Sequence, residues 1–211
     1  MTLIKKHDAP ASDAPPEYRH QSRDRAGLLR QLEADAAEQR RWAALDLAAF
    51  PDAADALCAR LEQETQTAVR EAILTTLIQI GGNPVVCGLM PLLRSEDAAL
   101  RNQVIEALQQ LPEAVSPYME RMLVDEDTDY RIFAINVLAN LRHPQAPVWL
   151  QGVIERDDNI NACAAAVEGL AEIGTPEALP ALAALPKRFA DDPFMQFCTQ
   201  TAIRRIQGHD A

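Results

Sequence analysis

Apolar residues recur along this chain at a helical spacing that is fixed relative to an arginine. Between Val69 and Gly81, counted from Arg70, the apolar residues lie at offsets +3, +4, +7 and +10. This spacing is one face of an α-helix with 3.6 residues per turn. The same offsets from three other arginines also meet only apolar residues, so the sequence predicts four equivalent amphipathic helices. Their anchors and core positions are Arg40 with Ala43, Ala44, Leu47 and Phe50; Arg70 with Ile73, Leu74, Leu77 and Ile80; Arg101 with Val104, Ile105, Leu108 and Leu111; and Arg131 with Ala134, Ile135, Leu138 and Leu141.

Two further copies extend the pattern towards the C-terminus. One has Cys163 in place of the arginine, and a weaker one starts at Gln196 and has Thr199 and Gln200 at core offsets. The six anchors are separated by 30, 31, 30, 32 and 33 residues, and a period in this range is typical of a solenoid. We therefore expect an all-α fold, a right-handed α-solenoid (α-α superhelix) of about six helix pairs. Each anchored helix is called B, and the apolar helix that precedes it is called A.

Prolines and acidic turns mark the expected helix boundaries. Prolines recur once per repeat where an A helix should begin, and acidic turns precede the B helices, where carboxylates cap free amides and complement the helix dipole. The prolines are Pro51, Pro84, Pro112, Pro144 and Pro176, and the turns contain Asp97, Asp125, Asp127, Asp157 and Asp192. Residues 1–22 are rich in Ala, Pro and charge without periodicity, which predicts a disordered tail before a repeat domain over residues 23–208.

Charge and cysteine content narrow the function classes. The formal net charge is −11, which disfavours nucleic acid and anionic membrane surfaces as ligands. The four cysteines form no C-x-x-C pair, so neither a zinc site nor a disulfide framework is indicated. The sequence shows no signal peptide and no apolar run of membrane-spanning length, so we expect a cytoplasmic protein.

The repeats resemble a known family. The segments VREAILTTLIQIG (69–81), LRNQVIEALQQL (100–111), YRIFAINVLANL (130–141) and LAEIGTPEALPAL (170–182) are similar to the HEAT-like repeats of phycobilisome lyase subunits and many other bacterial proteins. The resemblance covers about residues 23–208 and implies the helix-pair fold. It leaves function open, because one fold hosts many activities.

The sequence indicates no catalytic or metal centre. Members of the deoxyhypusine hydroxylase branch bind iron through His-Glu dipeptides, and none of the four histidines here is followed by Glu. The run Asp125-x-Asp127-x-Asp129 starts like a calcium loop, but Tyr130 and Asn136 occupy the positions of the required glycine and glutamate. No phosphate-loop, dinucleotide or serine-hydrolase motif occurs. We therefore predict a protein that is not an enzyme and has no cofactor or metal.

The repeated arginines have a structural interpretation. Such residues commonly form a ladder between adjacent HEAT-like repeats, so their loss should loosen neighbouring repeats rather than remove an activity. The predicted inter-repeat set is Arg40, Arg70, Arg101 and Arg131.

The offsets left over after the core is assigned predict a binding face. B helices of such solenoids usually line the concave surface, and here that stripe is polar, acidic and rich in amides. Its large apolar residues Trp42, Ile132 and Phe133 are either anchors of a protein interface or residues that pack under the tail or a neighbouring repeat. The expected function is a non-enzymatic scaffold or adaptor that binds another protein or a basic peptide in this acidic concave groove. The alternative is a lyase-like or maturation factor that presents a cofactor-bearing client. The predicted binding residues are Trp42, Gln103, Glu106, Ile132, Phe133, Asn136, Asn140, Glu168 and Glu172.

The last repeat must cover an apolar face, either as a cap or as a dimer contact. The polar residues Thr199 and Gln200 at its core offsets favour a cap, and hence a monomer.

Overall fold

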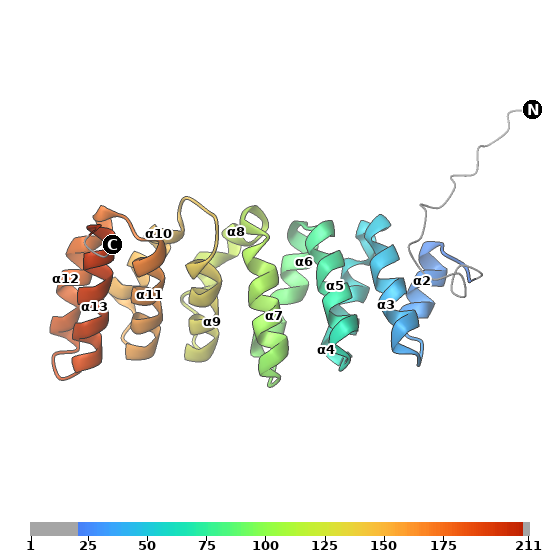
Figure 1. Ribbon diagram of the computed structural model, residues 1–211, viewed down its shortest axis with the longest axis horizontal. Coiled ribbons are helices and arrows are strands. Elements are labelled where there is room, and N and C mark those ends of the chain that lie inside the picture. The colour runs from blue at the N-terminus through green and yellow to red at the C-terminus, as the bar shows by residue number, and fades with distance from the viewer. Residues whose placement is uncertain (1–20, 209–211) are drawn as a thin grey trace, which may run out of the picture. The chain divides into compact units, whose positions relative to one another are not determined.

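The computed structural model describes residues 21–208, which form two compact units that divide between Leu92 and Leu93. Every regular element of these residues is an α-helix or a 3₁₀-helix, and no strand occurs among them (Figure 1). The all-α prediction with six helix pairs is confirmed. Most of the expected disordered tail, together with His7, His20 and His209, lies outside the described residues.

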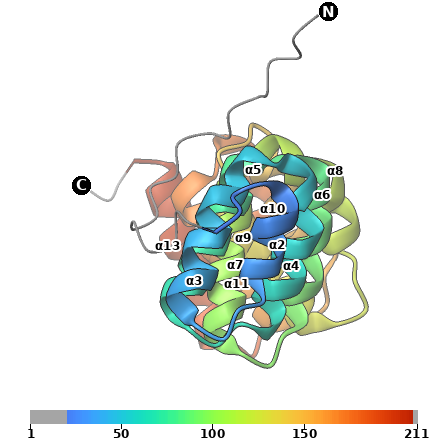
Figure 2. The same ribbon diagram turned by 90° about the vertical axis from the view of Figure 1, so that its right-hand side faces the viewer.

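Unit 1 is built from two layers of helices. In the B layer α3 packs against α5, in the A layer α4 packs against α6, and α2 and α3 pack side by side (Figure 2). Short 3₁₀ segments connect them. The elements are α2 (Arg25–Leu32), α3 (Ala37–Asp46), η1 (Leu47–Ala49), η2 (Pro51–Ala53), α4 (Ala54–Gln63), α5 (Thr67–Ile80), α6 (Gly82–Leu89) and η3 (Met90–Arg94), whose last two residues belong to unit 2.

Unit 2 repeats the same arrangement. Its B helices α7, α9, α11 and α13 pack each against the next, and α10 packs against α12 in the A layer. The elements are α7 (Ala98–Gln109), α8 (Pro112–Met122), α9 (Thr128–Ala139), α10 (Ala146–Arg156), α11 (Ile160–Ile173), η4 (Pro176–Ala178), α12 (Leu179–Arg188) and α13 (Pro193–Ile206).

The predicted core positions face the interior. Of the sixteen positions assigned from the four arginines, all are buried except Phe50 and Ile80, which are half-buried. In the terminal copy the polar Thr199 is buried, and its hydroxyl donates to the Met195 carbonyl at 2.8 Å, whereas Gln200 is exposed. The hydrophobic period therefore identified the buried face of the four arginine-anchored B helices.

The acidic turns cap the B helices as predicted. Asp97, Asp127 and Asp192 accept hydrogen bonds from backbone amides in the first turns of α7, α9 and α13, and Asn159 does the same for α11. These side chains satisfy amides that have no partner within the helix.

The anchor residues share a contact that the sequence did not reveal. In all six copies the anchor side chain donates a hydrogen bond to the backbone carbonyl six residues earlier, in its own A-to-B turn. The pairs are Arg40 with Ala34, Arg70 with Glu64, Arg101 with Ser95, Arg131 with Asp125, Cys163 with Asp157, and Gln196 with Ala190. These carbonyls follow the end of the A helix and have no partner within that helix. The anchor position therefore closes the turn, and a thiol or an amide can replace the guanidinium in that contact.

Two of the four arginines, Arg40 and Arg131, are seen to bind a carboxylate of the next repeat as well. Arg40 forms a bidentate pair with Glu64 (2.7 and 2.9 Å), and Arg131 forms one with Asp157 (2.7 and 3.1 Å). The guanidinium of Arg101 instead lies over the ring of Phe133, 5.1 Å from its centroid. Inter-repeat bonding thus differs from one copy of the pattern to the next.

Candidate functional site

The B helices of unit 2 form a polar groove, which we call the B-face groove. It has a volume of about 420 Å³ and is lined by residues of α7, α9 and α11 together with Asn140, which follows α9. These helices lie side by side because each packs against the next through small or apolar residues. The lining residues are Asn102, Ile105, Glu106, Gln109, Asn136, Ala139, Asn140, Ala165, Glu168, Gly169 and Glu172.

Gly169 brings the floor of the groove close to its neighbours. A Cβ at this position would lie 2.9 Å from Leu150 Cδ1 and 3.4 Å from Ala139 Cβ. A larger residue would push α11 away from α9 and α10, so the glycine permits the close approach of these helices.

The groove contains carboxylates without an ionic partner. Among the described residues, Glu106 and Glu168 are exposed and take part in no ion pair, whereas Glu172 is paired with Arg205 of α13. Amide side chains lie between the carboxylates, and Gln109 Nε2 donates to the Asn136 carbonyl at 2.9 Å across α7 and α9. The groove is therefore anionic and offers both hydrogen-bond donors and acceptors.

Five of the nine predicted binding residues line this groove, and four do not. Those in the groove are Glu106, Asn136, Asn140, Glu168 and Glu172. Gln103, Ile132 and Phe133 are half-buried on α7 and α9 outside the lining, and Trp42 belongs to unit 1. The helical offsets placed these five residues on helices that line the groove, but they could not separate side chains that face the groove from those that do not.

Trp42 is embedded in a local polar cluster of unit 1. The Arg41 guanidinium lies 4.9 Å from its ring centroid, and Arg23 donates to the Trp42 carbonyl. The Arg23 guanidinium also pairs with Asp46. The indole Nε1 is buried without a hydrogen-bond partner. The Trp42 ring thus already has a partner within unit 1, the Arg41 guanidinium.

Several groove residues were not predicted as binding residues. Asn102, Ala165 and Gly169 lie at offsets +1, +2 and +6 from their anchors, which belong to the predicted stripe, whereas Gln109 lies at offset +8, which the stripe does not include. They were missed because they lie where two adjacent B helices approach each other. A residue in this place both lines the groove and contacts the neighbouring helix, so its helical offset alone does not show that it faces the groove. The presence of small residues at those offsets was the available signal.

Two cysteines have thiols that burial makes unreactive. Burial raises the pKa of Cys58 to about 12 and that of Cys163 to about 11, so both are protonated at neutral pH. The part of the chain that the structure describes contains no group of three or more His, Cys, Asp or Glu side chains arranged to hold a metal ion. Between residues 21 and 208 no helix has the length and apolar character needed to cross a bilayer.

Comparison with known families finds HEAT repeats over residues 115–193. This segment includes α9 to α12 whole and all but the first turn of α8. The chain therefore contains HEAT-like repeats, as its motifs indicated. The phycobilisome lyase subfamily is not confirmed. No curated protein matches the chain.

The chain is also similar to several solved structures, among them a HEAT-like and an armadillo repeat protein. An engineered protein is 19% identical over 86% of this chain and 95% of its own, with a TM-score of 0.42. A HEAT-like repeat protein from the archaeon Thermococcus onnurineus NA1 is 16% identical over 87% of both chains, with a TM-score of 0.47. A designed armadillo repeat protein is 15% identical over 85% of this chain and 98% of its own, with a TM-score of 0.38. At these identities the likeness concerns the fold alone.

Proposed function

We propose that this protein is a non-enzymatic scaffold that binds a basic segment of another protein in the B-face groove. The observation that carries this proposal is the pair of unpaired carboxylates, Glu106 and Glu168, which lie in one groove with the amides of Asn102, Asn136 and Asn140. Like charges that share a groove repel each other, and a cationic ligand relieves that repulsion. The amides supply hydrogen bonds to a peptide backbone or to a guanidinium.

The groove suits a side chain or a short segment better than a large globular surface. Its volume of about 420 Å³ lies at the small end of the range of ligand sites. Lysine and arginine side chains combine a long apolar stem with a charged head. The stem has Ile105, Ala139 and Ala165 to pack against, and the head has Glu106 and Glu168 to pair with.

Selection from a display library of short random peptides tests the proposal. We expect the selected sequences to be enriched in Lys and Arg, and their affinity to fall at least tenfold in the Glu106→Lys/Glu168→Lys variant. The control is Glu113→Lys/Glu155→Lys, which changes the net charge equally at exposed positions outside the groove. Neutral or acidic selected sequences, or equal losses in the two variants, would show that the groove is not the site.

A further inference from the structure

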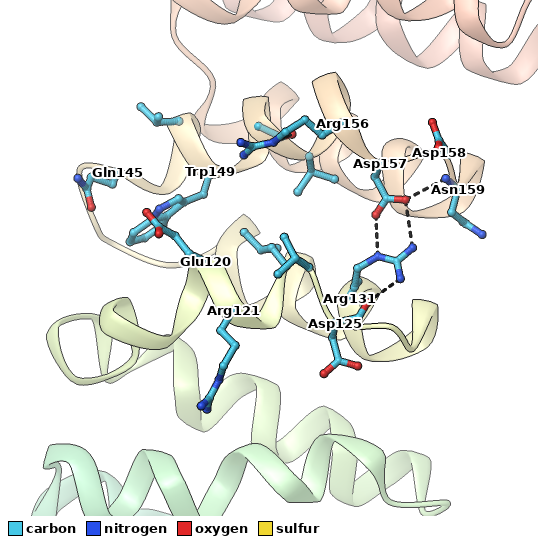
Figure 3. Close-up of a pocket in the computed structure, with 15 residues that line it drawn as sticks. Glu120, Arg121, Asp125, Arg131, Gln145, Trp149, Arg156, Asp157, Asp158 and Asn159 are labelled. Atoms are coloured by element: carbon cyan, nitrogen blue, oxygen red, sulfur yellow. Dashed lines mark hydrogen bonds and ion pairs between the residues drawn. The ribbon is translucent and has the colours of Figure 1, made fainter.

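A second and larger cleft lies in the A layer of unit 2, between α8 and α10. Its volume is about 1220 Å³, and its residues belong to neither the B-face groove nor the predicted binding set (Figure 3). We call it the A-layer cleft.

The cleft exists because α8 packs against the rest of the unit mainly through one face. Its buried residues Val115, Met119 and Met122 form a single stripe at i, i+4 and i+7. Whereas α10 packs closely against both α11 and α12, it makes few contacts with α8. In this unit the A layer is thus open at one place, where two neighbouring helices do not pack.

The walls of the cleft are more apolar than an exposed surface requires. Val124 and Val148 are 73% and 65% exposed, and they are two of the four large apolar side chains that stand out as exposed in the described chain. Leu123 and Trp149 add half-buried apolar surface between them. Figure 3 shows Trp149 directed from α10 towards α8, beside Glu120. A concave apolar strip of this kind marks an interaction site.

The charges around the cleft are mostly neutralised within the protein. Arg131 pairs with Asp157, and Asp125 pairs with Arg94. Three charged lining residues form no ion pair among the described residues, namely Glu120, Arg121 and Arg156. The Arg121 guanidinium lies over the ring of Tyr118, and Arg156 Nε donates to the Gly152 carbonyl of its own helix at 3.1 Å. Gly152 makes room for this conformation, since a Cβ there would lie 2.4 Å from Arg156 Nη2. The exposed Arg156 guanidinium over the apolar wall therefore has free donors for a carboxylate.

We propose that the A-layer cleft binds an amphipathic helix of another protein, with apolar side chains entering between α8 and α10 and an Asp or Glu pairing with Arg156. We expect the partner segment to be a helix, because a helix can pack between α8 and α10, which make few contacts with each other. The lining of α10 runs from Gln145 to its C-terminal end, about 16 Å or three turns. This length accommodates anchors at i, i+3 or i+4, and i+7. The partner differs in charge from the basic segment proposed for the B-face groove, so one unit binds two kinds of segment on separate faces.

The test is selection of helical peptides of about 14 residues, long enough for the three turns of the cleft, from a display library against the full chain. We expect apolar residues at helical spacing with at least one flanking Asp or Glu. The affinity of the selected peptide should fall at least tenfold in Val124→Ser/Val148→Ser. The matched control is Phe194→Ser/Phe197→Ser, which removes the other two exposed apolar side chains, 62% and 63% exposed, and should leave the affinity unchanged.

A charge swap tests the role of Arg156 separately. Arg156→Glu should lower the affinity at least tenfold, and replacing the peptide's carboxylate residue by Lys should restore it. Glu106→Lys/Glu168→Lys should have no effect, which separates this site from the B-face groove. Equal loss in both double-serine variants, basic selected sequences, or no enrichment at all would overturn the proposal. Self-association of the chain that Val124→Ser/Val148→Ser abolishes would also overturn it, since a second copy would then be the occupant.

Discussion

Glu64 is the most completely enclosed charge among the described residues. Its side chain has no exposed surface, and its carboxylate accepts hydrogen bonds from Arg40, Arg60 and the amides of Thr65 and Gln66. Burial alone would raise the pKa of the carboxyl, but the hydrogen bonds from Arg40, the Gln66 amide and Arg60 outweigh it and lower the pKa from 4.5 to about 2. A buried carboxylate is stable only when it is bonded in this way.

This shift predicts how the stability of unit 1 depends on pH. Because the folded-state pKa lies below the unfolded value, the stabilisation is fully present above pH 4.5 and is lost as the pH falls from about 4.5 to about 2. It amounts to about 3 kcal/mol at neutral pH. Urea denaturation should show Glu64→Gln less stable than the wild type at pH 7, with a gap that narrows at pH 3. If the difference in stability between the two proteins did not change with pH, Glu64 would not be ionised in the folded protein.

Arginines at the same repeat position should differ in their energetic effects. Arg131 pairs with Asp157, whose side chain is only 9% exposed. Arg131→Ala therefore leaves a buried charge without its partner, at a cost of about 3 kcal/mol in the free energy of unfolding. Both arginines donate to the carbonyl six residues earlier, but Arg101 has no ion pair among the described residues, so Arg101→Ala should cost about 1 kcal/mol. Chemical denaturation of both variants measures the difference, and Arg131→Ala/Asp157→Ala should recover much of the loss. Equal costs would show that the carboxylate contributes nothing.

At the scale of the helix, the A layer is closely packed in some places and open in others. Between α4 and α6, a Cβ on Gly88 would lie 2.5 Å from the Sγ and 2.9 Å from the Cβ of the buried Cys58. In α10, the atoms nearest to a Cβ on Gly152 would be those of the guanidinium of the exposed Arg156. Both glycines lie inside A helices and have a close neighbour. The neighbour of Gly88 is the buried Cys58, whereas the neighbour of Gly152 is the end of a long, exposed side chain.

Gly88→Ala should destabilise the protein by about 1–3 kcal/mol, because α4 and α6 must separate to admit the methyl group. Gly152→Ala should be neutral or slightly stabilising, since Arg156 can move aside and alanine has the higher helix propensity. Thermal unfolding of the two variants, followed by circular dichroism, compares them directly. If Gly152→Ala were the more destabilising, the packing described for α10 would be wrong.

At the scale of the whole molecule, the two proposed sites differ in the charge of the partner that each would bind. The chain carries a net charge of −11, so the B-face groove adds local carboxylates to a field that already attracts cations. The A-layer cleft offers mainly apolar surface, and salt screens apolar contacts far less than exposed charges. The ionic strength should therefore affect the two sites differently.

Raising the salt concentration from about 50 to about 500 mM should weaken a basic peptide at the B-face groove about tenfold or more, and a helix at the A-layer cleft by less than threefold. Fluorescence polarisation with the selected peptides measures both affinities under identical buffers. Glu113→Lys/Glu155→Lys serves again as the charge-matched control for the groove. Equal salt dependence at the two sites would contradict the assignment of an electrostatic site and an apolar one.

Local sequence determined the helices and their buried faces, because a period of 3.6 residues and the side-chain caps of α7, α9, α11 and α13 depend only on neighbours in the chain. It also placed Glu106, Asn136 and Glu168 on a polar face of successive B helices. The tertiary structure alone decided which side chains meet between helices that lie about 30 residues apart in sequence. Packing between helices determined that Arg40 and Arg131 bind a carboxylate of the next repeat whereas Arg101 lies over Phe133 of the next repeat, and that α8 and α10 leave a cleft. These outcomes depend on how far apart two helices settle, and that distance follows from the summed volumes of side chains in both, which no single stretch of sequence contains.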